Sequence, residues 1–124
     1  MNTFYLFLFL LAAGLNSTAQ ILLKKGALAI ASVLSGPEAL AVKAFRAFTN
    51  PFIAVAVILL ATGMFLWIKI ISRIELSRAY PINIALTVII TSVVAIFLFG
   101  ESMSVSKAGG ILLILLGIWV TLGA

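Results

Sequence analysis

The chain has 124 residues, of which 65% are hydrophobic and 9% are charged, and its mean hydropathy is +1.35. Soluble domains are nearer half apolar, so this composition predicts an all-helical membrane protein. The net charge is +5, and the sequence contains neither Cys nor His, which excludes disulfides, thiol nucleophiles, imidazole bases and the usual metal ligands. We therefore expect no metal, no cofactor and no enzyme activity, and we assign the cations to membrane lipids rather than to nucleic acid.

The first of four apolar runs covers residues 3–23. About 20 helical residues cross the roughly 30 Å of hydrocarbon in a bilayer, so this run is long enough to span it. It has no basic start of the kind found in secretory signals, and we interpret it as a retained span. Lys24, Lys25 and Gly26 follow it, which predicts a cationic stop and a helix break.

An amphipathic segment at residues 37–48 lies between the first and second runs. Its apolar side chains share one helical face, with the cations opposite: Leu40, Ala44, Phe45 and Phe48 against Lys43 and Arg46. This pattern predicts an interfacial helix, with an extension of the flanking spans as the alternative.

The second run covers residues 51–71, because Thr49-Asn50-Pro51 supplies a helix cap and then a proline at a first helical position. A very short turn leads to the third run, residues 76–99, so we expect these two spans to be antiparallel neighbours. The fourth run covers residues 108–121. Together the runs predict a single four-helix transmembrane domain over residues 1–124.

The cations divide unequally between the two sides of such a domain. One side carries Lys69, Arg73 and Arg78 with both termini, and the other carries Lys24, Lys25, Lys43, Arg46 and Lys107. The positive-inside rule then favours termini outside the cytoplasm, while insertion in both orientations as an antiparallel pair stays open. We expect a multi-pass protein of the inner membrane.

Two stripes of polar residues reach the middle of the bilayer. Asn16 and Gln20, four residues apart, share a face of the first run, and Tyr80, Asn83, Thr87 and Thr91 follow helical spacing on the third. Facing stripes would line a polar route toward cations at the span ends, whereas the alternative is hydrogen bonding between helices at about 0.6 kcal/mol each. The candidate substrate-binding residues are Asn16, Gln20, Lys24, Lys25, Arg78, Tyr80, Asn83 and Thr87.

No Asp or Glu stands in the middle of any run, which disfavours a site that exchanges a proton for a cationic substrate. Glu101 is the possible coupling residue, with a solvated cap or an ion pair as the alternative. Gly110 and Gly117, seven residues apart, predict either a helix pair across a subunit boundary or close packing within one subunit. Since four helices are few to enclose an alternating-access cavity, we expect a dimer.

Several motifs resemble the drug/metabolite transporter superfamily: Gln20 followed by Lys24, Ala79-Tyr80-Pro81, and Phe99-Gly100-Glu101 before a glycine-rich run. Within it the chain is similar to small multidrug resistance proteins, which implies a dimer whose fourth helices pair through Gly110 and Gly117. At the position of that family's membrane carboxylate the chain has Asn16. At the positions of its pocket tryptophan and glycine-rich bend it has Asn83, Ala85 and Thr87.

The Gln20-to-Lys24 spacing and Ala79-Tyr80-Pro81 also resemble the four-helix subunits of the aminoarabinose phosphoundecaprenol flippase. This resemblance implies a polyprenyl-phosphate-linked sugar, or another amphipathic anionic lipid, as the substrate. Cations and hydrogen-bond donors suit such a phosphate. We therefore predict a flippase that acts as a homodimer or as a heterodimer with a similar four-helix chain. A multidrug or small-metabolite exporter and a non-transporting accessory subunit are the alternatives.

Overall fold

The computed structural model describes residues 3–123. Their helices are α1 (Thr3–Ala29), α2 (Ala31–Leu34), α3 (Leu40–Thr49), α4 (Pro51–Ile71), α5 (Leu76–Phe99) and α6 (Val105–Gly123). Of these, α1, α4, α5 and α6 are long and apolar enough to cross a membrane. The chain is thus an all-helical, multi-pass membrane protein with an amphipathic linker helix, α3, between its first two spans, which confirms the predicted fold class.

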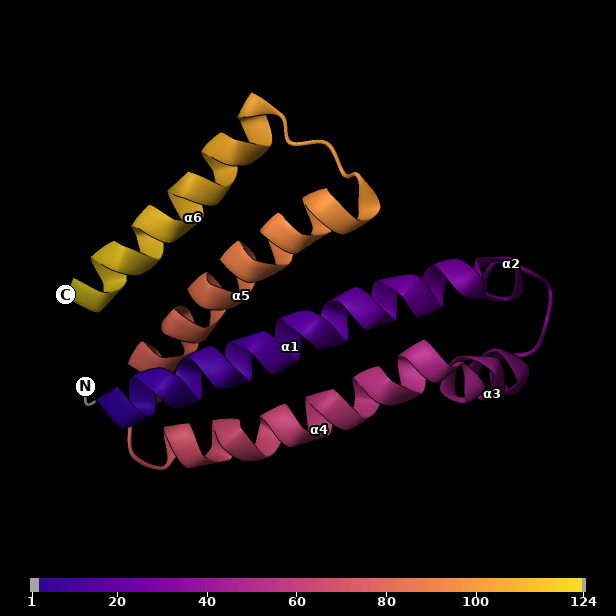
Figure 1. The fold of residues 1–124 in the computed structure, drawn as a ribbon, viewed down its shortest axis with the longest axis horizontal. Coiled ribbons are helices and arrows are strands. Elements are labelled where there is room, and N and C mark those ends of the chain that lie inside the picture. Colours follow the sequence, from indigo (N-terminus) through magenta and orange to yellow (C-terminus); the bar gives the residue numbers. More distant parts are fainter. Residues whose placement is uncertain (1–2, 124) are drawn as a thin grey trace.

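Helix α1 is the central element of the bundle, because it lies between α4 and α5 and packs along both (Figure 1). The core joins Leu8, Phe9 and Ala12 of α1 to Ile70 of α4 and Ala79 of α5. Helices α4 and α5 are connected by a short turn but otherwise contact each other little. The expectation that these two spans are neighbours is therefore wrong for most of their length, since α1 is inserted between them.

Helix α6 stands apart from the bundle and contacts mainly α5 (Figure 1). None of its residues, Val105–Gly123, is buried. It begins three residues before the expected start at residue 108, because Ser104 Oγ accepts a hydrogen bond from Lys107 N at 3.0 Å and caps the first turn. The chain thus has a packed group of three spans and a fourth span at its side.

Gly26 does not end α1, which corrects the sequence interpretation. The helix continues through Lys24 and Lys25 to Ala29, and Gly26 is buried within it. A Cβ atom at this position would collide with Ile53 Cγ1 and lie 3.0 Å from Asn50 Oδ1. The glycine therefore lets the last turns of α1 approach the start of α4 closely.

Asn50 determines where α4 begins. Its Oδ1 atom accepts hydrogen bonds from Phe52 N at 3.0 Å and Ile53 N at 3.2 Å, with Pro51 at the first helical position. The extended backbone of Asn50, at ψ 127°, separates α4 from α3, so α3 is a helix of its own and not an extension of a span. Ala39 is also extended, at ψ 152°, which is why α3 begins after the expected residue 37.

Helix α5 passes through Pro81 without interruption and ends at Gly100, whose φ of +61° lies in the left-handed region. Glycine adopts this conformation without the Cβ penalty of other residues. The chain then turns toward α6 and places Glu101 beside the far end of α1.

Candidate functional site

A cavity of about 230 Å³ lies between α1, α4 and α5. Its lining residues are Ala12, Asn16, Leu60, Gly63, Met64, Trp67, Tyr80 and Asn83. The structure therefore brings together three of the predicted site residues, Asn16, Tyr80 and Asn83. None of the described residues that line the cavity carries a charge, and nowhere in residues 3–123 do three or more acidic side chains gather as a metal site.

The polar groups of this cavity are amides and a phenol. Within residues 3–123, neither the Asn16 nor the Asn83 side chain makes a hydrogen bond to another protein group. Each amide has two N–H donors and one carbonyl acceptor, and the Tyr80 hydroxyl can both donate and accept. Most of the cavity lining is apolar, and the three polar side chains can exchange hydrogen bonds with a few hydroxyl groups of a ligand. The lining offers a formal counter-charge to neither a cation nor an anion.

An aromatic pair forms one wall of the cavity. The rings of Trp67 and Tyr80 meet edge to face, with centroids 6.2 Å apart and an interplanar angle of 64°. Trp67 is a lining residue that the sequence analysis did not include among the candidate site residues. The very short turn to α5 is the signal that could have found it, because that turn brings the last turns of α4 beside Tyr80.

The polar stripe of α5 continues beyond the cavity. Thr87 follows Asn83 by one helical turn and Thr91 follows by two. The hydroxyls of Thr87, Thr91 and Ser17 are buried without a hydrogen-bond partner in the described part of the chain. A row of unsatisfied hydroxyls therefore extends from Asn83 along the interior of the subunit, and each carries a desolvation cost that a polar ligand would relieve.

Gln20 is placed differently from Asn16. Its side chain is exposed, and it does not line the cavity. Shared helical spacing brings the two amides to neighbouring parts of one face of α1, but only Asn16 lies where α4 and α5 enclose a space.

The predicted cations lie at opposite ends of the bundle, because α1 and α5 run in the same direction (Figure 1). Arg78 is in the first turn of α5 and lines a pocket with Glu75, Ser77, Thr121 and Leu122. Lys24 is near the end of α1, beside Glu101. About 32 Å of helix, at 1.5 Å per residue, separates Arg78 from Phe99, and Glu101 follows two residues later. Lys24, Lys25 and Arg78 thus do not form one cluster. The two lysines lie at one end of the bundle, and Arg78 lies at the other.

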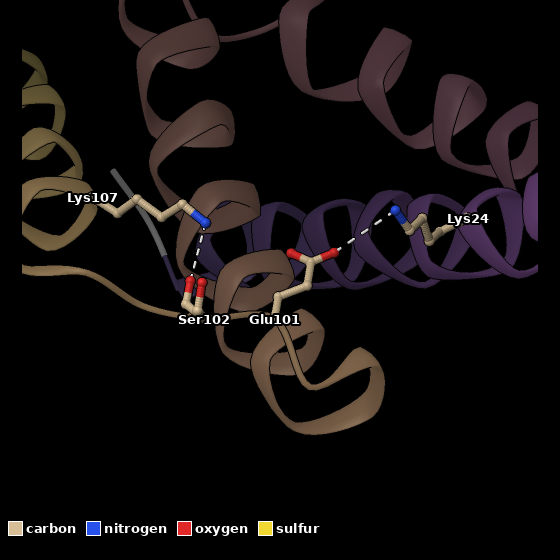
Figure 2. Close-up of polar contacts among 4 residues, drawn as sticks. All are labelled: Lys24, Glu101, Ser102 and Lys107. Carbon is tan, nitrogen blue, oxygen red and sulfur yellow. Dashed lines mark hydrogen bonds and ion pairs between the residues drawn. The ribbon is translucent and has the colours of Figure 1, made fainter.

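Glu101 is held at one end of the bundle by an ion pair. Its Oε1 atom lies 4.0 Å from Lys24 Nζ, and the two side chains are 46% and 50% exposed. Figure 2 shows this pair. Lys107 Nζ, from the first turn of α6, donates a hydrogen bond to the Ser102 carbonyl in the same loop at 3.0 Å. Glu101 also borders a groove between α5 and α6 that includes Gly110. Its carboxylate is therefore outside the Asn16 cavity. Lys24, the ion-pair partner of Glu101, is about 12 Å from Asn16 along α1.

Lys25 faces away from this ion pair. Its Nζ atom lies 5.9 Å from the centroid of the Phe52 ring at the start of α4. Successive residues of a helix point about 100° apart, so the adjacent lysines serve different sides of α1.

A family model described as "Small Multidrug Resistance protein" matches residues 23–114, which is most of the chain. The chain belongs to the small multidrug resistance family. The family match covers the end of α1, the linker, α4, α5 and half of α6, so it includes Tyr80, Asn83 and Glu101 but not Asn16.

Three curated proteins are similar to this chain and carry the same printed name, "Probable 4-amino-4-deoxy-L-arabinose-phosphoundecaprenol flippase subunit ArnE". The protein of Serratia proteamaculans (strain 568) is 36% identical over 73 residues, which are 59% of this chain and 63% of that protein. The protein of Pseudomonas fluorescens (strain Pf0-1) is 30% identical over 73 residues, with the same shares. The protein of Pseudomonas paraeruginosa (strain DSM 24068 / PA7) is 32% identical over 69 residues, which are 56% and 59% of the two chains.

The chain thus spans about three fifths of the length of the curated relatives it matches. No solved structure matches it significantly. These comparisons place the chain in the small multidrug resistance family.

Proposed function

We propose that this chain is a subunit of an inner-membrane flippase for a lipid-linked sugar of the polyprenyl-phosphate type, or for another amphipathic anionic lipid. One observation carries the proposal: an uncharged, hydrogen-bonding cavity lies between three spans, and cations lie at both ends of the same bundle. A substrate that crosses between leaflets meets a phosphate-binding group at each end. The printed names of the relatives support a lipid-linked sugar.

Different residues of the site match different parts of the substrate headgroup. Asn16, Asn83 and Tyr80 match sugar hydroxyls, because amides and phenols both donate and accept. Lys24 and Arg78 match the phosphate, for which a charge-assisted hydrogen bond is about twice as strong as a neutral one. The prenyl chain stays in the surrounding lipid. This arrangement does not require a membrane carboxylate that exchanges a proton for the substrate.

Gln20 and Thr87 extend the route on either side of Asn16 and Asn83. Thr87 supplies an unsatisfied buried hydroxyl next to the cavity. Gln20 is exposed on α1 between Asn16 and Lys24, so it contributes to a route that a second subunit closes. Lys25, above the Phe52 ring, adds to the positive charge at this end.

We also propose that two four-helix chains assemble through α6. A Cβ atom at Gly110 or Gly117 would meet nothing within 4 Å in the single chain, so neither glycine is needed for packing inside the subunit. Large apolar side chains of α6 are exposed, including Leu113 at 70% and Trp119 at 73%. Small residues in a membrane helix allow a second helix to approach closely. The partner is a copy of this chain or a similar four-helix chain.

The experiment is a lipid-scrambling assay with the purified chain in proteoliposomes. A fluorescent polyprenyl-phosphate sugar placed in one leaflet should reach the other, and Asn16→Ala combined with Asn83→Ala should slow this movement at least tenfold. Thr18→Ala is the matched control, because Thr18 lies on the exposed side of α1 and only bonds to Gly14 O at 2.7 Å. Movement restored only by adding a second four-helix chain identifies a heterodimer. Absence of movement under both conditions supports the accessory-subunit alternative.

Family membership favours one further candidate, an exporter of drugs or small metabolites, in which Glu101 is the coupling group. Growth in toxic quaternary ammonium compounds separates the two functions. Resistance that depends on the chain and disappears with Glu101→Gln would contradict the flippase proposal. We expect no such resistance, because Glu101 lies at the end of the bundle in an ion pair with Lys24 and not in the cavity.

A further inference from the structure

Helix α3 carries an apolar face that no described part of the chain covers. Leu40, Phe45 and Phe48 are 81%, 68% and 65% exposed, and none of the helix's residues is buried. Lys43 and Ala47, on the other side of the helix, are half-buried, and α3 contacts α4. The aromatic face therefore points away from the subunit.

The depth of α3 follows from its connection to α4. The 21 residues of α4 extend about 32 Å, which matches the hydrocarbon thickness of a bilayer. The extended backbone at Asn50 ends α3 immediately before this span begins, and α3 lies at that end of the bundle (Figure 1). Helix α3 is therefore at the level of the lipid headgroups.

The charge of this end of the bundle complements anionic lipids. Residues 24–50 contain four cations and one carboxylate, Glu38. Two of the cations, Lys43 and Arg46, belong to α3 itself, and Lys25 lies over Phe52 at the adjoining start of α4. A helix with aromatic and aliphatic residues on one face and Lys or Arg on the other lies in the membrane interface, where anionic lipids strengthen its binding.

We propose that α3 is a binding site for anionic phospholipid headgroups at the membrane surface. Leu40, Phe45 and Phe48 insert among the upper acyl segments, and Lys43 and Arg46 bind the headgroup phosphates. The site is separate from the Asn16 cavity, and its function does not depend on which substrate the cavity carries. The lipid is the occupant that the depth and the charge select, and a protein partner on the same face is an outcome that the experiment recognises.

The test uses a single cysteine in the full chain, which is straightforward because the sequence contains no Cys. Phe48→Cys, labelled with the environment-sensitive dye NBD, reports on the apolar face, and Arg46→Cys with the same label is the matched control on the polar face. Both are measured in nanodiscs of phosphatidylcholine alone and of phosphatidylcholine mixed with phosphatidylglycerol. Spin-labelled lipids should quench the dye at position 48 much more strongly than at position 46, and phosphatidylglycerol should increase this quenching.

Charge is tested in the Phe48→Cys background. Arg46→Gln should raise the water-exposed fraction of the dye about fivefold in the anionic nanodiscs, the effect expected of one juxtamembrane cation. Arg73→Gln, which removes one cation from the opposite end of the bundle, should leave it unchanged. A dye at position 48 that is as exposed to water as at position 46 would overturn the proposal. So would shielding that spin-labelled lipids cannot quench, which indicates a protein partner, or quenching that is indifferent to phosphatidylglycerol.

Discussion

Lys24 Nζ lies 4.0 Å from Glu101 Oε1, so an ion pair links the end of α1 to the loop that follows α5. Both side chains are about half exposed, and pairs of this kind contribute at most about 1 kcal/mol to stability. The pair therefore matters less for folding than for access to Lys24, since a phosphate that binds there competes with the Glu101 carboxylate.

Exchange of the two charges distinguishes a role of Lys24 in the ion pair from a role in binding the substrate phosphate. Lys24→Glu and Glu101→Lys together restore an ion pair but move the cation to the loop. If Lys24 binds the substrate phosphate, lipid scrambling by the double variant stays as low as that of Lys24→Glu alone, while its thermal stability in detergent equals that of the parent. Full recovery of scrambling in the double variant would show that only the ion pair is required.

Asn16→Asp places a carboxylate in a cavity whose described lining is uncharged. An anionic headgroup would then meet repulsion in a medium of low dielectric, so we expect scrambling of a polyprenyl-phosphate sugar to fall by tenfold or more. Asn16→Gln keeps the amide and should retain more activity than Asn16→Asp. Unchanged scrambling in the aspartate variant, measured at a pH where the carboxyl is ionised, contradicts the assignment of Asn16.

Tyr80 supplies both a ring and a hydroxyl to the cavity, and two substitutions separate them. Tyr80→Phe keeps the edge-to-face contact with Trp67 and removes one hydrogen bond worth about 1 kcal/mol, so binding of the headgroup should weaken about fivefold. Tyr80→Ala also removes the aromatic contact, worth roughly a further 0.5–1.5 kcal/mol. Titration of a water-soluble glycosyl phosphate, followed by Trp fluorescence, measures both. Equal affinities for Tyr80→Phe and the parent would exclude the hydroxyl from binding.

Gly26→Ala tests the close approach of α1 to α4. The added methyl group collides with Ile53, and overpacking of this kind typically costs about 1–3 kcal/mol. We expect a lower midpoint of thermal unfolding in detergent. Gly14→Ala is the matched control on the same helix, because a Cβ atom there meets nothing within 4 Å. A similar midpoint for both variants would show that the bundle relaxes around residue 26.

Asn50→Ala removes the acceptor of two backbone hydrogen bonds at the start of α4. The loss of an N-cap costs about 1 kcal/mol, so the unfolding midpoint should fall, and Asn50→Asp should retain most of the stability because aspartate caps equally well. Circular dichroism of the three proteins in detergent checks this order. A midpoint for Asn50→Asp as low as that for Asn50→Ala would indicate that the amide N–H groups, and not Oδ1, stabilise this turn.

Much of the helical architecture follows from local chemistry in the sequence. Asn50-Pro51 marks the start of α4, and Gly100, with its positive φ, marks the end of α5. These signals act within a few residues of the boundary they set, so a single sequence contains them. The amphipathic pattern of Leu40–Thr49 is likewise local, although its first residue depends on the extended backbone at Ala39.

The features that the sequence does not reveal depend on tertiary contacts. Gly26 is a helix breaker by its propensity, but the approach of Ile53 makes it a packing residue inside α1. Helical spacing placed Asn16 and Gln20 together, yet only the position of α4 and α5 decides that Asn16 lines a cavity and Gln20 is exposed. Trp67 became a candidate only when its ring was found beside Tyr80.

The isolation of α6 has a consequence for how the protein is held together in lipid. Hydrocarbon chains solvate Leu113 and Trp119 as well as another helix would, so no expulsion of water presses α6 against α5. Its tilt is therefore governed by its loop and by whatever it meets in the membrane plane. The final position of α6 therefore depends on its surroundings, and membrane composition or subunit stoichiometry can alter it without unfolding the rest of the chain.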